Sequence, residues 1–173
     1  MTFSIEERHD ELVIEIGKLV ELSTRLTSNP EPERRGGIAS FLLSGHVYPL
    51  FSVRVGEISD VAEWDKYWGF SREKVYRVQS DFLRDPNNIV SSWQTREPEI
   101  GRYGGAVIFN LKGDRTALYN IISFSGLDEQ VDEAVALTMG FKLGWTNKDF
   151  LDRVLSASEN HVFWELLKDS TLY

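Results

Sequence analysis

The chain has 173 residues, of which 42% are hydrophobic and 27% are charged, which is typical of one globular domain and excludes a disordered chain. It contains no Cys, which excludes disulfide frameworks, thiolate metal sites and Cys nucleophiles and favours a reducing compartment. The net charge of −8 disfavours binding to nucleic acid or anionic lipid, and no apolar run approaches the roughly 18 residues of a membrane span, so we expect a cytoplasmic protein that binds neither nucleic acid nor membrane.

The first expected element is a long amphipathic helix over about residues 5–27. Ser4 and Glu7 form a capping-box pattern at its start. Behind them, an apolar stripe recurs at steps of four and three at Leu12, Ile16, Leu19, Ser23 and Leu26. This stripe is typical of a helix that packs on a sheet, and a seam between two molecules is the alternative. The segment 28–37 contains two prolines and paired glycines and is predicted to be a charged loop.

Two hairpins are predicted, each followed by a helical region. Residues 38–43 and 47–55 are rich in strand formers around a tight turn at 44–46, and Pro49 indicates an edge strand or a bulge. A second hairpin is expected over 106–111 and 117–124, with its turn at 112–115. The order of elements therefore predicts an antiparallel α/β (α+β) layer structure rather than a parallel sheet.

The helical region after the first hairpin starts at Ser59 or Asp60 and ends at the turn 85–88, where Pro86 cannot continue a helix. Gly69 and Ser71 predict that it breaks and restarts, and Trp64 and Trp68 are assigned to its apolar face. A loop or short strand follows, up to Trp93. The last helices are expected from Asp128 towards Gly144, over 148–155 and over 160–167.

Two motifs in the second half resemble the signature of the GlcG/HbpS-like family, also called haem-degrading-domain proteins. The segment 103–107 (Tyr-Gly-Gly-Ala-Val) is similar to the family's aromatic-Gly-Gly-apolar strand entry. The segment 122–132 resembles its strand that ends in Ser-Gly-Leu before an acidic helix start. The likeness is closest to the family's short branch of uncharacterised proteins and covers about residues 38–143.

The resemblance implies a profilin-like fold, with a five-stranded antiparallel sheet flanked by helices, in a single domain over 1–173. The N-terminal helix over about 5–27 precedes this core, and an extra C-terminal helical tail over about 146–173 follows it. The family also implies a homo-oligomer, either a dimer or a ring of dimers. Its name implies haem binding or degradation for some members, although their His or Thr ligands have no matching position in this chain.

The candidate ligand-binding residues lie at two glycine turns and on the second helix. Tyr103, Gly104 and Gly105 offer backbone N–H groups and close approach to a ligand, and a strand-entry bulge is the structural alternative. Ser125 and Gly126 precede a helix N-terminus that attracts anions, and capping by Asp128, with Glu129 or Asp132 in the first turn, explains the same residues.

Arg72, Lys74 and Arg77 are close on one predicted helix and are candidates to hold an anion that faces the glycine turns, with solvated salt bridges as the alternative. No catalytic residue and no metal ligand is predicted, because His9, His46 and His161 are scattered and no nucleophile stands beside a base. The sequence thus favours a non-catalytic oligomeric module that binds a small anionic ligand or a partner. The alternatives are a protein that binds or degrades haem or another tetrapyrrole, and a protein–protein adaptor.

The C-terminal tail carries an apolar segment, Phe163-Trp164 followed by Leu166-Leu167, that needs a surface to cover it. That surface belongs either to a neighbouring subunit or to the tail's own subunit.

Overall fold

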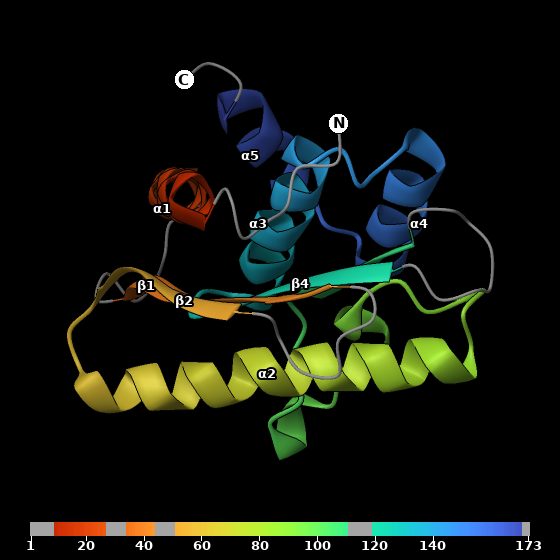
Figure 1. Ribbon diagram of the computed structural model, residues 1–173, viewed down its shortest axis with the longest axis horizontal. Helices are drawn as coiled ribbons and strands as arrows, with labels where there is room; N and C mark the ends of the chain where they lie inside the picture. The colour runs from red at the N-terminus through yellow and green to blue at the C-terminus, as the bar shows by residue number, and fades with distance from the viewer. Residues whose placement is uncertain (1–8, 27–33, 44–50, 111–118, 171–173) are drawn as a thin grey trace.

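A computed structural model shows a mixed α+β fold in which helices cover both faces of one antiparallel sheet (Figure 1). The structure describes residues 9–26, 34–43, 51–110 and 119–170. Its elements in chain order are α1 (His9–Leu26), β1 (Arg34–Leu42), β2 (Phe51–Ile58), α2 (Val61–Arg84), the 3₁₀ turns η2 (Ser92–Thr95) and η3 (Pro98–Ile100), β3 (Ala106–Asn110), β4 (Tyr119–Ser125), α3 (Glu129–Lys142), α4 (Lys148–Ser158) and α5 (Val162–Ser170). The expected helix start at Ser4 and the two hairpin turns lie outside the described residues, as does Pro49.

The sheet has the strand order β2-β1-β4-β3, and every pair is antiparallel. The described residues form four strands, so the expected fifth strand is not found among them. The segment after α2 reaches the outer edge of β3 through a single bridge, Ser91 to Val107, and then turns into η2. The turn begins there because the Ser91 and Gln94 side chains form a capping box that supports a helical turn instead of a longer ladder.

Strand β1 begins at Arg34, so the predicted loop was wrong over residues 34–37. The paired glycines belong to the strand because neighbouring backbones come very close to it. A Cβ atom on Gly36 would lie 2.5 Å from the Val55 carbonyl oxygen, and one on Gly37 would lie 2.3 Å from that of Ser125. Glycine here marks close approach of strands rather than a flexible connection.

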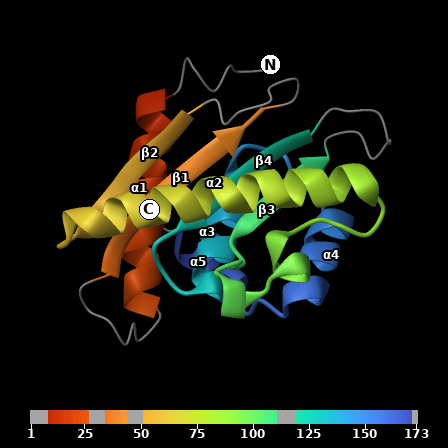
Figure 2. The same cartoon turned by 90° about the horizontal axis from the view of Figure 1, so that it is seen from below.

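Helix α2 runs without a break from Val61 to Arg84 and crosses one face of the sheet (Figure 2). Asp60 caps it as predicted, because its carboxylate accepts the Ala62 N–H at 2.8 Å, and the helix ends before Pro86 as predicted. The predicted break at Gly69 and Ser71 was wrong, since burial of one continuous face outweighs the cost of about 1 kcal/mol of a helical glycine. That face consists of Tyr67, Ser71, Lys74, Val75, Val78, Asp81 and Phe82.

Two predicted core residues of α2 lie elsewhere. Trp68 is exposed, and Trp64 is half-buried with its ring 5.3 Å from the Arg54 guanidinium carbon. Ser71 instead faces the sheet, where its hydroxyl donates to Ser40 Oγ at 2.8 Å and lies 2.6 Å from Ser123 Oγ. These three buried hydroxyls satisfy one another between helix and sheet, so a polar residue on the buried face costs little.

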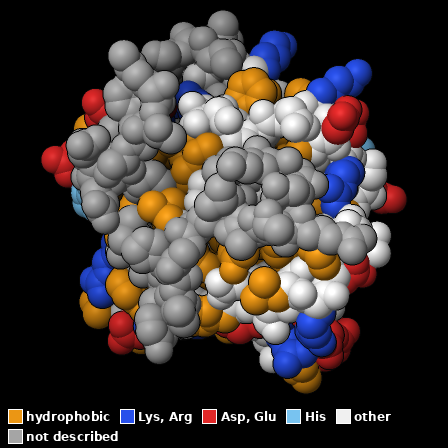
Figure 3. Space-filling view, turned by 45° about the vertical axis from the view of Figure 1, so that its right-hand side comes forward, with side chains coloured by type: hydrophobic (Ala, Val, Ile, Leu, Met, Phe, Trp, Pro, Cys, Tyr) orange, Lys and Arg blue, Asp and Glu red, His pale blue; other side chains and the backbone are white. Residues whose placement is uncertain are grey.

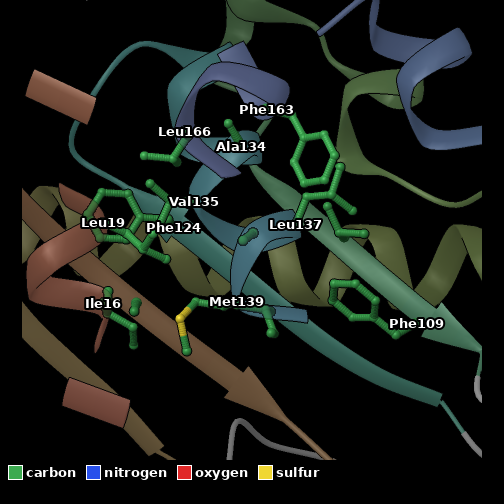
Figure 4. Packing of buried hydrophobic residues seen from close by; sticks show 14 of the residues in the cluster. Ile16, Leu19, Phe109, Phe124, Ala134, Val135, Leu137, Met139, Phe163 and Leu166 are labelled. Atoms are coloured by element: carbon green, nitrogen blue, oxygen red, sulfur yellow. The ribbon is translucent and has the colours of Figure 1, made fainter. Parts of the chain in front are cut away.

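The opposite face of the sheet is covered by α1, α3 and α5, which enclose the larger hydrophobic core (Figure 4). Residues 131–140 of α3 are all buried, because this helix lies between the sheet and the outer helices. The α1 stripe is buried against the chain's own core, and Phe163 and Leu166 of α5 are fully buried there too. Of the two alternatives for the tail, the structure therefore supports packing on its own subunit.

Candidate ligand-binding site

Three segments that are distant in the sequence meet around one pocket of about 240 Å³. They are the first half of α2, the turn before β3, and the turn between β4 and α3. The lining residues are Lys66, Tyr67, Phe70, Lys74, Tyr103, Ser125, Gly126, Leu127, Asp128, Glu129 and Asp132. This volume lies just below the roughly 300–1,000 Å³ of pockets for drug-sized ligands, so the space suits a small metabolite.

One wall of the pocket is aromatic. Tyr67, Phe70 and Lys74 are spaced three and four residues apart, so they lie on one side of α2. The Tyr103 ring packs edge-to-face on Phe70 with ring centroids 5.2 Å apart. The wall thus combines rings from α2 and from the turn before β3, and its shape depends on how that turn is held.

Arg77 holds the turn in place. Its guanidinium donates to the carbonyl oxygens of Ser92, Thr95 and Tyr103 and to the Thr95 hydroxyl, and it is paired with Glu73 at 2.7 Å. These bonds engage the guanidinium fully within the protein, and Arg77 does not line the pocket. It supports the position of Tyr103 rather than offering donors to a ligand.

A buried ion pair forms the floor. Lys74 Nζ donates to Asp132 Oδ2 at 2.8 Å and to the Phe124 carbonyl oxygen at 2.9 Å, and the two side chains are only 1% and 3% exposed. The other Asp132 oxygen accepts the Leu127 N–H at 3.0 Å. Burial raises the pKa of Asp132 from 3.8 to about 6, while the Lys74 ammonium opposes the rise by favouring the carboxylate.

Gly105 makes room for that ion pair. Its φ of +113° lies in the region that favours glycine, and a Cβ atom there would lie 2.6 Å from the Asp132 Cβ and 2.8 Å from the Lys74 Nζ. The glycine pair of the predicted motif therefore has a steric reason. Gly104 is crowded as well, since a Cβ atom there would lie 2.7 Å from the Trp93 ring, although its φ is not positive.

The backbone donors expected near the two turns are already engaged in part. Gly104 N–H donates to Glu129 Oε2 at 2.6 Å, and Leu127 N–H donates to Asp132. Asp128 occupies the N-cap position of α3 as predicted, but its side chain makes no capping hydrogen bond. Asp132 supplies the carboxylate that binds the Leu127 N–H instead.

Of the seven residues predicted for the site, Tyr103, Ser125 and Gly126 line the pocket. Gly104 and Gly105 lie beside it, Arg77 holds the Tyr103 turn, and Arg72 is half-buried with its Nη2 3.4 Å from the Tyr76 hydroxyl. Lys74, which the sequence offered as an anion-binding candidate beside the two arginines, also lines the pocket, but it is paired with Asp132. Asp128, Glu129 and Asp132 were expected only as residues of a helix start, and Lys66, Tyr67 and Phe70 were not chosen from the sequence. The signal for a buried partner of Lys74 was its place within the apolar stripe of α2.

A second buried carboxyl stands next to Asp132 in α3. Glu133 accepts from the Ser91 hydroxyl and, at 3.0 Å, from the Asn160 side-chain amide, and burial raises its pKa. It links α3 to the segment before η2 and to the start of α5. Its partners are all structural elements, so we assign it to the fold.

The residues present do not fit haem. The pocket lining contains no His or Met, and His9 and His161 are exposed at other places in the fold. The pocket of about 240 Å³ is also smaller than the roughly 300–1,000 Å³ of common cofactor sites. Among the described residues, no group of three or more His, Asp or Glu side chains is arranged to hold a metal ion.

Figure 3 shows acidic and basic side chains interspersed around the outline of one face, without a continuous area of either sign among its described atoms. Within the described ranges, no helix combines the length and apolar character needed to cross a membrane. The class that fold and pocket define is an α+β domain with a small, partly aromatic, acid-rimmed pocket. Comparison with known proteins finds no match to a family model, to a curated protein or to a solved structure.

Proposed function

We propose that the chain is a non-catalytic, cytoplasmic, homo-oligomeric module of the GlcG/HbpS-like type with a profilin-like fold, and that it binds a small ligand in the pocket beside Tyr103. The observation that carries the proposal is the convergence of the two family-like motifs on one pocket. Tyr103 comes from the first motif, Ser125 and Gly126 come from the second, and all three line it. Sites of this kind combine an apolar wall with a few fixed polar groups.

A binding role suits the chemistry of the floor better than a catalytic one. Lys74 and Asp132 are the groups with the greatest potential for proton transfer, and both are closed in by Phe124, Leu127 and each other. A general base has to reach the proton that it removes, and these side chains are almost fully buried. The pair therefore shapes the pocket rather than reacting in it.

A fragment screen by protein NMR tests this proposal. We expect at least one small polar compound to shift the resonances of Tyr103, Gly126 and Leu127, and we expect Tyr103→Leu to weaken its binding about tenfold because the aromatic wall is lost. The control variant Trp68→Leu changes an exposed aromatic residue on α2, outside the pocket lining, and is expected to leave binding unchanged.

Three outcomes would contradict the proposal. The first is a screen in which no compound shifts these resonances. The second is turnover of a substrate that is lost when Asp132 is changed to Asn. The third is a saturable Soret shift with haemin, which would favour the haem alternative.

Self-association is the second part of the proposal, supported by the resemblance and by exposed aromatic side chains. Trp164 is 53% exposed and Phe141 is 42% exposed, although both belong to helices of the main core layer. We expect light scattering at micromolar concentration to give at least twice the chain mass of 19.8 kDa. Trp164→Ser is expected to shift the mass downward, whereas Leu83→Ser, at an exposed position on α2, is the control. A monomer for the intact chain would make this part wrong.

A further inference from the structure

We infer that the pocket beside Tyr103 takes a small organic cation, such as a primary or methylated ammonium compound. This inference rests on the proposed function and specifies its ligand class. It differs from the anion that the helix N-terminus suggests in the sequence. The two observations behind it are the aromatic wall and the balance of charge around the cavity.

The aromatic wall comes first. Tyr67, Phe70 and Tyr103 line the same small space. The faces of aromatic rings attract cations, and rings that surround a pocket are the usual means of binding methylated ammonium groups. The negative faces of these rings disfavour an anion, which would also lose part of its hydration beside them.

The charged side chains around the pocket indicate which sign of charge a ligand should carry. Lys74 is neutralised by Asp132 at 2.8 Å. Lys66 also lines the pocket, and its Nζ lies 3.1 Å from Glu63 Oε2 and 5.6 Å from the centroid of the Tyr67 ring. Glu129 is 3.9 Å from Arg96 Nη1. These three pairs cancel.

Asp128 then remains as one negative charge at the rim. It is exposed, and its side chain makes no hydrogen bond or ion pair with another described residue, although its backbone carbonyl accepts the Asp132 N–H at 2.8 Å. The carboxylates of Asp128 and Asp132 offset the positive end of the α3 dipole, and Asp132 also accepts the Leu127 N–H. The net charge of −8 on the whole chain also favours the approach of a cation over that of an anion, within the range that salt screening allows.

The test compares ligands of the same shape. Choline and its neutral isostere 3,3-dimethylbutan-1-ol are titrated by NMR, together with butylamine, acetate and inorganic phosphate. We expect choline or butylamine to shift Tyr103 and Gly126, and choline to bind at least fivefold more tightly than the neutral isostere. Acetate and phosphate are expected to cause no saturable shift.

Three variants report on the sign of the charge. Asp128→Asn is expected to weaken cation binding about three- to fivefold, and Lys66→Gln is expected to strengthen it about twofold, because each removes one partly screened charge near the ligand. Asp149→Asn is the matched control, since this aspartate is also exposed, in the first turn of α4, and lies outside the pocket lining.

The results separate this inference from the function on which it rests. Binding of the neutral isostere as tightly as choline, saturable binding of phosphate at these residues, or stronger cation binding by Asp128→Asn would each overturn the cation inference. If no amine shifts the pocket resonances while another fragment does, the inference fails and the ligand-binding function stands. If no compound of any class shifts them, both fail.

Discussion

Replacing Gly105 by Ala is expected to lower the free energy of unfolding by about 3–5 kcal/mol, which is a large share of the stability of an ordinary domain. A methyl group at this position meets three atoms that have no room to move. They are the Asp132 Cβ at 2.6 Å, the Lys74 Nζ at 2.8 Å and the Phe124 carbonyl oxygen at 2.9 Å. The ammonium cannot retreat, because it is held by the carboxylate and by that same carbonyl.

The backbone adds a second cost, because φ at Gly105 is +113° and L residues avoid that region at about 1–3 kcal/mol. Gly144→Ala is the matched control. Gly144 also has a positive φ, +72°, but a Cβ atom there meets no heavy atom within 4 Å. Gly144→Ala is therefore expected to lower the free energy of unfolding only by the cost of the backbone conformation, about 1–2 kcal/mol.

Urea unfolding followed by tryptophan fluorescence measures both variants against the wild type. The difference between them isolates the steric contribution beside the ion pair. Equal losses for the two variants would show that only the backbone conformation requires glycine at position 105 and that the packing around Lys74 tolerates a methyl group.

The helices and the antiparallel layering could be predicted from the sequence because they are local. The four-and-three spacing of Leu12, Ile16 and Leu19 marks a helix that buries one side, and Asp60 and Pro86 mark the ends of α2. Each of these patterns depends only on residues within one or two helical turns. They can therefore be recognised without knowing the tertiary contacts.

Errors arose where tertiary contacts outweigh local preference. Paired glycines such as Gly36 and Gly37 are typical of a loop, yet both lie in β1. The backbones of β2 and of Ser125 come so close there that a Cβ atom on either glycine would clash with them. Gly69 resembles a helix break, yet the buried side of α2 holds the helix together across it. In both cases the deciding partner is distant in the sequence, so no local pattern reports it.

The same reasoning explains how much of the site was predicted. Tyr103, Ser125 and Gly126 stand out because turns before and after strands carry special residues. The aromatic wall on α2 does not, since a tyrosine and a phenylalanine on a helix are ordinary core residues. Pairing of Lys74 with Asp132 joins α2 to α3, and only the fold brings those helices to the same pocket.

The ion pair itself gives the second large prediction, which concerns pH. Lys74→Met is expected to lower the free energy of unfolding by about 3–5 kcal/mol at pH 8, because it leaves the Asp132 carboxylate buried without its cation. Lys66→Met is the control on the same helix. The Lys66 side chain is 45% exposed and paired with Glu63, so its loss is expected to cost at most about 0.5–1 kcal/mol.

The sign of the pH dependence follows from the pKa of Asp132. In the folded wild type this pKa is raised from 3.8 to about 6, so the native state holds a proton that the unfolded state has released between those values. The contribution of Asp132 to stability is therefore full below about pH 4 and falls as the pH rises through 6. Removal of the Lys74 cation takes away an interaction that lowers this pKa, so in Lys74→Met the fall extends to higher pH.

Urea unfolding between pH 4 and pH 8 checks these expectations, and a second substitution separates charge from packing. The loss in Lys74→Met is expected to be small near pH 5, where Asp132 is protonated, and to grow steadily towards pH 8. Lys74→Met/Asp132→Asn removes both charges from the floor of the pocket and is expected to recover most of the stability at pH 8 with no such pH dependence. A loss that is independent of pH, or a double variant as unstable as the single one, would mean that the methylenes of Lys74 stabilise the fold and that its charge does not.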